Sequence, residues 1–128
     1  MRLLLDTHSL LWWLEDAPAL SEKARELISD PTNLVLVSTA SIWEVAIKAR
    51  LGRLDVPDDL ESFFTRQLSL NGFDVLPVHL QHAALVRHLD DHHNDPFDRL
   101  LVAQARCEKI PLVSKDRWLD AYDVEIIW

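Results

Sequence analysis

Four acidic residues are spaced so that strand ends and helix starts could bring their carboxylates together: Asp6, Glu44, Asp98 and Asp116. Mg²⁺ and Mn²⁺ prefer hard oxygen ligands in near-octahedral geometry, and such ions usually bind few carboxylates directly and keep several waters. One or two ions held in this way can activate water for attack on a phosphodiester and stabilise the entering and leaving oxygens. These residue types therefore indicate metal-dependent phosphodiester hydrolysis.

Two of these acids, Asp6 and Asp98, lie in apolar stretches of the chain, from Leu3 to Thr7 and from Pro96 to Leu101. An ionised carboxylate buried without a partner is costly, so these positions favour a bound cation or a paired charge. A second interpretation stays open for each of the 21 acidic residues, namely that it caps a helix or is a solvated surface charge. Spacing and polarity alone do not decide between these interpretations.

The elements that must position these residues follow from the spacing of apolar residues. Short apolar runs bounded by polar or turn residues predict five buried strands, at Leu3–Leu5, Leu34–Val37, Phe73–Leu76, Leu112–Val113 and Val124–Ile127. Three- and four-residue spacing predicts six helices, at Ser9–Asp16, Ser21–Ser29, Thr39–Leu51, Pro57–Leu70, His79–Leu89 and Pro96–Cys107. Pro57 and Pro96 suit a first helical turn, and Gly52 and Gly72 fall where helical patterns end. Strands alternating with helices predict an α/β fold with a parallel sheet covered on both faces.

The predicted elements give each acid a defined place. Asp6 and Asp116 follow strands, at the carboxyl ends where parallel α/β sheets bind their ligands. Glu44 lies one to two turns into its helix, and Asp98 lies in the first turn of another. The positive end of a helix dipole favours a carboxylate in the N-terminal half of a helix.

Composition limits the class of protein. A chain of 128 residues, with 48% hydrophobic and 27% charged residues, predicts one globular domain over residues 1–128. The net charge of −8 argues against nucleic-acid binding through phosphate contacts, unless the carboxylates hold divalent cations that reverse the local field. No apolar stretch reaches the length of a membrane span, so we expect no membrane association and a cytoplasmic location. The single cysteine, Cys107, excludes an internal disulfide and is interpreted as a packing residue.

Four segments of the chain carry a family resemblance: Leu3–His8, Ser41–Lys48, His92–Ala105 and Val113–Asp116. In this order, and over essentially the whole chain, they resemble the PIN-domain nucleases, and specifically the VapC-like toxins of type II toxin–antitoxin systems. The third segment is the most specific, whereas the first alone would be weak. The resemblance implies a three-layer α/β/α sandwich with a central parallel sheet of about five short strands.

The resemblance also implies an activity, a metal site and partners. The activity would be a Mg²⁺- or Mn²⁺-dependent endoribonuclease that cuts single-stranded RNA, kept inactive by a cognate antitoxin and forming a homodimer. Carried over residue by residue, the metal ligands would be Asp6, Glu44, Asp98 and Asp116, with Asp95 as an additional nearby acid. Because Asp95 directly precedes Pro96, a helix N-cap is an equally open interpretation of that residue.

Five further residues are candidates for contacting substrate: Thr7, His8, Lys48, Arg99 and Ser114. The hydroxyls of Thr7 and Ser114 neighbour proposed ligands and could orient a carboxylate, or they could be ordinary turn residues at strand ends. His8 could contact a phosphate or start the first helix. Lys48 and Arg99 could bind phosphate, or each could pair with an acid on its own helix.

Two aromatic features suggest further hypotheses. His92 and His93 beside Asp95 raise the question of zinc, but adjacent histidines in a loop rarely point at one ion and no cysteine accompanies them. Zinc is therefore not predicted. Trp12 and Trp13 make the first helix apolar nearly all round, so part of that helix is predicted to form a surface for an antitoxin or a second copy of the chain.

Other enzyme classes also place an Asp after a first strand and bind Mg²⁺. Receiver domains need a paired acid early in the chain and a separate phosphoaccepting Asp after a middle strand, whereas haloacid-dehalogenase-type enzymes need a second Asp where this chain has His8. Neither pattern is present. The alternatives that stay open are a PIN-like nuclease that acts on DNA or in RNA processing without an antitoxin, and a non-catalytic binding module of the same fold.

Overall fold

The five predicted strands form one parallel sheet in the computed structural model, which describes residues 1–128. The strands are β1 (Arg2–Leu5), β2 (Leu34–Ser38), β3 (Asp74–Leu76), β4 (Leu112–Val113) and β5 (Ile126–Ile127). Their order across the sheet is β3-β2-β1-β4-β5, and every neighbouring pair is parallel. The predicted fold class, an α/β protein with a central parallel sheet of five short strands, is confirmed.

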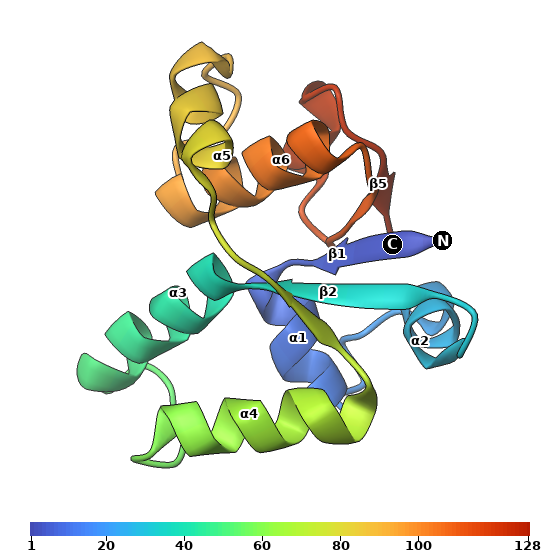
Figure 1. The fold of residues 1–128 in the computed structure, drawn as a ribbon, viewed down its shortest axis with the longest axis vertical. Coiled ribbons are helices and arrows are strands. Elements are labelled where there is room, and N and C mark those ends of the chain that lie inside the picture. The colour runs from blue at the N-terminus through green and yellow to red at the C-terminus, as the bar shows by residue number, and fades with distance from the viewer.

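Helices cover both faces of this sheet (Figure 1). The α-helices are α1 (Thr7–Leu14), α2 (Glu22–Ser29), α3 (Thr39–Arg50), α4 (Leu60–Asn71), α5 (Leu80–Leu85) and α6 (Pro96–Glu108), and two short 3₁₀ helices are η1 (Val86–His88) and η2 (Arg117–Ala121). Helices α1, α2 and α4 lie on one side of the sheet, and α5 and α6 lie on the other. The result is the three-layer α/β/α arrangement.

The central strand β1 contributes to both cores because successive side chains of a strand point to opposite faces. Leu3 and Leu5 belong to one apolar cluster, which includes Phe64 of α4, whereas Leu4 belongs to the other, which includes Leu101 of α6. All three leucines of β1 are completely buried. Each such leucine stabilises the fold by about 1.5–3 kcal/mol, so the strand that directly precedes Asp6 is firmly held.

The carboxyl ends of β1 and β4 meet near the centre of the sheet. The strand order reverses there, since β1 is followed by β2 on one side while β4 and β5 lie on the other. Open α/β sheets bind ligands in the crevice at such a switch point. The N–H of Asp6 and the hydroxyl of Ser9 both donate to the carbonyl of Val113, each at 3.1 Å. These bonds fix the first turn of α1 to the end of β4.

Of the two prolines predicted to lie in first helical turns, one does. Pro96 is the first residue of α6, and the side chain of Asp95 caps that helix. The prediction for Pro57 is wrong, because α4 begins only at Leu60. Asp59 is the N-cap that moves the boundary, since its carboxylate accepts a backbone N–H of the first turn.

Short elements differ most from the predictions. The helix predicted over His79–Leu89 is divided into α5 and η1, and η2 was not predicted at all. The five residues of η2 are too few to show a helical period, and the cap at Asp116 is what starts this turn. Gly52 and Gly72 do follow helices, with φ angles of +73° and +68° that favour glycine.

The apolar side chains of α1 pack mostly against the core of the molecule. Trp12 packs against Trp128 with a ring separation of 5.7 Å, and Trp13 packs against Phe73 at 6.1 Å. The indole N–H of Trp13 donates to Asn71 at 2.9 Å. Both rings are therefore partly buried against the core. The predicted partner surface on part of α1 stays a prediction. None of the helices has the length and apolar character needed to cross a membrane.

Candidate metal centre

One cavity at the carboxyl edge of the sheet contains three of the four predicted ligands. Its volume is about 250 Å³, and it is lined by Asp6, His8, Trp12, Asp98, Lys115 and Asp116. Asp6 follows β1, Asp98 lies in the first turn of α6, and Asp116 lies between β4 and η2. Segments far apart in the sequence therefore bring their carboxylates to the switch point of the sheet.

Asp6 is held by the start of α1. It is only 5% exposed, and its Oδ1 accepts the N–H of Ser9 at 2.8 Å, which makes it the N-cap of the helix. Burial raises the pKa of Asp6, an effect partly offset by hydrogen bonds from Ser114 and Ser9. The residue is a buried, oriented carboxylate for which a nearby cation would be favourable.

Glu44 lies on α3 and has both of its oxygens engaged. Its Oε1 accepts the hydroxyl of Thr7 at 2.7 Å, and its Oε2 accepts the ammonium of Lys48 at 2.6 Å, one turn later. Thr7 also lies 3.0 Å from the hydroxyl of Ser41. Thr7 is 3% exposed and orients Glu44, which was one of its interpretations, and its contact with substrate stays a prediction. Lys48 forms the helix pair that was one of its two interpretations.

Asp98 is partly buried among the other acids of the site, and both effects change its pKa. Its pKa is raised to about 7, first by burial and then by the nearby charges of Asp95 and Asp6. His93 lowers this pKa and Glu44 raises it further. Near neutral pH, about half of the Asp98 side chains would then carry a proton that a bound cation must displace.

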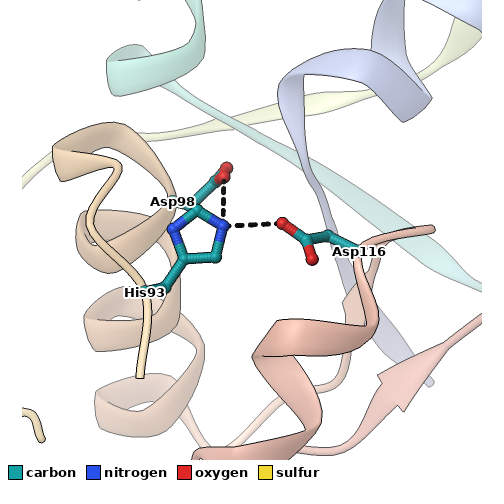
Figure 2. Close-up of side chains that lie close together, drawn as sticks. All are labelled: His93, Asp98 and Asp116. Carbon is teal, nitrogen blue, oxygen red and sulfur yellow. Dashed lines mark hydrogen bonds and ion pairs between the residues drawn. The ribbon is translucent and has the colours of Figure 1, made fainter. Parts of the chain in front are cut away.

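His93 links Asp98 and Asp116 (Figure 2). Its Nε2 lies 2.7 Å from Oδ2 of Asp116 and 3.5 Å from Oδ2 of Asp98. The Nδ1 atom accepts the backbone N–H of Asp95 at 3.0 Å, which assigns the ring proton to Nε2. His93 therefore donates a hydrogen bond to Asp116 and fixes one oxygen of that carboxylate.

Sequence reasoning considered His93 only as a zinc ligand and so missed this role. The two adjacent histidines do diverge, since the ring of His92 packs edge-on against Tyr122 at 5.1 Å. A histidine two residues before a capping Asp was the available signal, because its ring can reach the N–H of the cap residue. The direction of its second nitrogen is set by the position of Asp116, which the local sequence does not reveal.

Asp95 and Ser114 orient the segments that carry the ligands. Oδ1 of Asp95 accepts the N–H groups of Phe97 at 2.8 Å and of Asp98 at 3.1 Å, which is the N-cap interpretation. Ser114 is completely buried, and its hydroxyl accepts the N–H of Asp116 at 3.1 Å. Ser114 is thus placed to hold the Asp116 backbone. Its predicted role as a substrate contact stays a prediction.

Arg99 is turned away from the carboxylates. Its guanidinium donates to backbone carbonyls of the preceding loop, at distances from 2.9 to 3.3 Å: those of Val86, Leu89, Asp90 and His93. It also donates to the hydroxyl of Tyr122 at 3.1 Å. These bonds make Arg99 a clamp of the loop, and its contact with substrate stays a prediction. His8 is exposed and lines the cavity beside the acids.

The donor set fits a hard divalent cation. Carboxylates from Asp6, Asp98 and Asp116 border the same space, and the pKa of Asp98 is raised first by burial and then by repulsion from Asp95 and Asp6. A divalent ion would relieve that repulsion, and Mg²⁺ or Mn²⁺ matches carboxylate oxygens in chemical hardness. Zinc would favour nitrogen and sulfur ligands, and the nitrogen of His93 that faces the acids carries a proton.

Comparison with known proteins finds a ribonuclease among the relatives of this chain. Over 68 residues the chain is 37% identical to Ribonuclease VapC16 of Mycobacterium tuberculosis (strain ATCC 25618 / H37Rv). The matched segment covers 53% of this chain and 48% of that protein, so the chain matches about half the length of this relative.

Three solved structures share the fold over nearly the whole chain. VapBC2 from Rickettsia felis, bound to a DNA fragment from their promoter, has a TM-score of 0.73 at 14% identity and covers 100% of this chain and 99% of that chain. VapBC-1 from nontypeable Haemophilus influenzae has a TM-score of 0.69 at 16% identity, with 99% and 97% covered. VapBC-5 from Mycobacterium tuberculosis, a member of the VapBC family of toxin-antitoxin systems, has a TM-score of 0.60 at 20% identity, with 98% and 97% covered.

At these identities the three structures establish likeness of fold alone. The family itself is shown by a sequence model described as PIN domain, which matches residues 3–125. That range contains β2, β3, β4, all of β1 except Arg2, and all the carboxylates described above. The chain belongs to the PIN domain family.

Proposed function

We propose that this chain is a metal-dependent endoribonuclease that cuts single-stranded RNA with Mg²⁺ or Mn²⁺. The observation that carries the proposal is the convergence of Asp6, Asp98 and Asp116 on one cavity, with Glu44 buried beside them. Its relative VapC16 is named a ribonuclease, which favours RNA over DNA as the substrate.

The chain's own residues would keep the carboxylates in place before any substrate arrives. Ser9 orients Asp6 through its N–H, Thr7 and Lys48 hold Glu44, and His93 holds Asp116. A bound divalent ion supplies charge stabilisation for the phosphodiester and a more acidic water. Fixed ligands reduce the reorganisation needed as the reaction proceeds.

We also infer that the chain acts as the toxin of a toxin–antitoxin pair and forms a homodimer. The structural neighbours include a member of the VapBC family of toxin-antitoxin systems, which supports an antitoxin partner. An exposed apolar stripe on α3 supports a protein interface: Trp43 is 60% exposed, Ile47 37% and Leu51 61%, at four-residue intervals. Light scattering of the purified chain tests the homodimer.

A cleavage assay with the purified protein tests the proposed activity. Parent protein should cut a single-stranded oligoribonucleotide when Mg²⁺ or Mn²⁺ is present and stop when a chelator is added. Asp98→Asn should lose activity by about 100-fold or more while keeping its circular dichroism spectrum, because a ligand is lost. The matched control is Asp74→Asn, which removes the same charge from an exposed residue on β3 and should cut at the parental rate.

Two outcomes would contradict the proposal. If Asp98→Asn cut RNA as fast as Asp74→Asn, the carboxylate cavity would not be the active site. If the parent cut single-stranded DNA and left RNA of the same sequence intact, the substrate assignment would be wrong although the metal-dependent site stood.

A further inference from the structure

A second cavity lies directly beside the carboxylate cavity. Its volume is about 320 Å³, and its walls are His92, His93, Asn94, Asp95 and Trp118. His93 connects the two cavities, because it lines this one while its Nε2 donates to Asp116, which lines the other. The volume lies within the range of about 300–1,000 Å³ that is common for small-molecule sites.

Trp118 is the unusual wall of this cavity. It is 73% exposed, whereas its neighbour Leu119 on η2 is completely buried and anchors the turn in the core. Asp116 is the N-cap of η2 and accepts the N–H of Trp118 at 3.0 Å. The indole is thus held on a short, capped turn beside a proposed ligand, without contributing to the core.

The charge around the site limits how RNA can be held there. The chain carries a net charge of −8, Lys48 is paired with Glu44, and Arg99 is bound to loop carbonyls. Lys115, which lines the carboxylate cavity, and Arg117, which is 78% exposed, remain as cations that can meet phosphate. Phosphate contacts therefore supply only part of the affinity on this side of the carboxylates. Base stacking on an aromatic ring contributes about 1–3 kcal/mol per base and does not need a positive charge.

We propose that the cavity between Trp118 and Asn94 binds a nucleobase of single-stranded RNA, next to the phosphate that lies at the carboxylates. Trp118 stacks on the face of the base, and the side-chain amide of Asn94 and the ring of His92 offer donors and acceptors to its edge. This subsite rests on the proposed ribonuclease function. It adds the chemistry by which an acidic protein retains an unpaired strand.

RNA binding by Trp118 variants in the inactive Asp98→Asn background tests the subsite. Trp118→Ala should raise the Kd for a short single-stranded oligoribonucleotide about five- to one-hundred-fold, as the loss of one stacked base requires. Trp118→Phe should keep most of the affinity. Leu70→Ala, at another exposed apolar residue that lies on the far face of the sheet, should bind like the background protein.

A series of oligoribonucleotides with one abasic nucleotide at successive positions separates stacking from a structural effect. One position should weaken binding of the background protein as much as Trp118→Ala does, and Trp118→Ala should bind that abasic oligonucleotide no worse than the background protein does. Equal RNA Kd values for Trp118→Ala and the background protein would overturn the subsite. This holds even where Trp118→Ala weakens the binding of a partner protein. Absence of metal-dependent cleavage by the parent would count against the proposed function, and the abasic series would still decide the subsite.

Discussion

The carboxylates of the site are oriented mainly by backbone N–H groups. Asp6 and Asp116 each use Oδ1 to cap a helical turn, and Asp95 does the same for α6. A cap fixes the side chain at small cost, because the helix N-terminus carries unpaired N–H groups and a positive dipole end. Asp98 has no such role and lies among the other charges. Its side chain therefore shows the effect of their repulsion.

Thermal unfolding of the metal-free protein at two pH values should reveal this repulsion. The pKa of Asp98 is raised from 3.8 to about 7, so between these values the folded protein holds a proton that the unfolded chain has released. Stability contributed by this proton is present at low pH and is lost as the pH rises through about 7. We expect Asp98→Asn to raise Tm relative to the parent at about pH 8 and to raise it much less at about pH 5.

Mg²⁺ should act on the same balance of charges. At about pH 8 it should raise the Tm of the parent and have little effect on Asp98→Asn, since one ligand is missing. Asp74→Asn serves as the control and should follow the parent at both pH values. A Tm difference between Asp98→Asn and the parent that does not change with pH would show that Asp98 is not held in its protonated form.

Four helical elements bring their N-terminal parts to the carboxyl edge of the sheet: α1, α3, α6 and η2. Helices α3 and α6 carry the proposed ligands Glu44 and Asp98, and α1 and η2 are capped by Asp6 and Asp116. The loop before α6 is the element that needs additional support, because it contributes His93 but has no regular hydrogen bonding of its own. Arg99 and Tyr122 give this support from both sides, and the hydroxyl of Tyr122 accepts the N–H of His93 at 3.1 Å.

Arg99→Lys should loosen this loop although the charge is kept. A planar guanidinium reaches several carbonyls at once, whereas one ammonium cannot span them. Loss of these bonds should cost about 1–3 kcal/mol of unfolding free energy and speed amide hydrogen exchange over residues 86–95. Arg87→Lys, at an exposed side chain in η1, is the matched control. Unchanged exchange in Arg99→Lys would mean that the loop is held by other contacts.

At the scale of the whole molecule, the acidic site belongs to a chain with a net charge of −8. Few cations are free near the cavity: Lys115 lies over the ring of Trp12 at 5.9 Å, and Arg117 is 78% exposed with a weak pairing to Asp120. Counterion release on RNA binding grows with the number of phosphates that a protein neutralises. With about two such cations, the ionic part of RNA affinity should be small.

RNA affinity should therefore depend only weakly on salt. Raising the monovalent salt from about 50 to about 200 mM should weaken binding of single-stranded RNA to Asp98→Asn by less than about tenfold. Removing both cations, with Lys115→Gln and Arg117→Gln together, should flatten the dependence further. A loss of about a thousandfold over the same range would point to an extended phosphate-binding surface elsewhere on the protein.

The sequence alone determined the strands, most helices and the acids that follow them. Buried parallel strands are almost uniformly apolar, so Leu3–Leu5 and Leu34–Val37 were recognisable, and the residue after each strand necessarily lies at the carboxyl edge. The boundary at Pro57 and the short helix η2 could not be predicted. Caps at Asp59 and Asp116 decided both, and capping depends on side-chain geometry rather than on periodicity.

What the tertiary structure decided is which neighbours each site residue has. The contacts of the acidic residues could not be predicted: His93 donates to Asp116 from a loop 23 residues earlier, and Arg99 faces the loop although it adjoins Asp98. A local pattern of apolar and polar residues fixes an element and its buried face. The direction of a polar side chain is fixed by the donors and acceptors that other segments bring to it, and these exist only once the chain has folded.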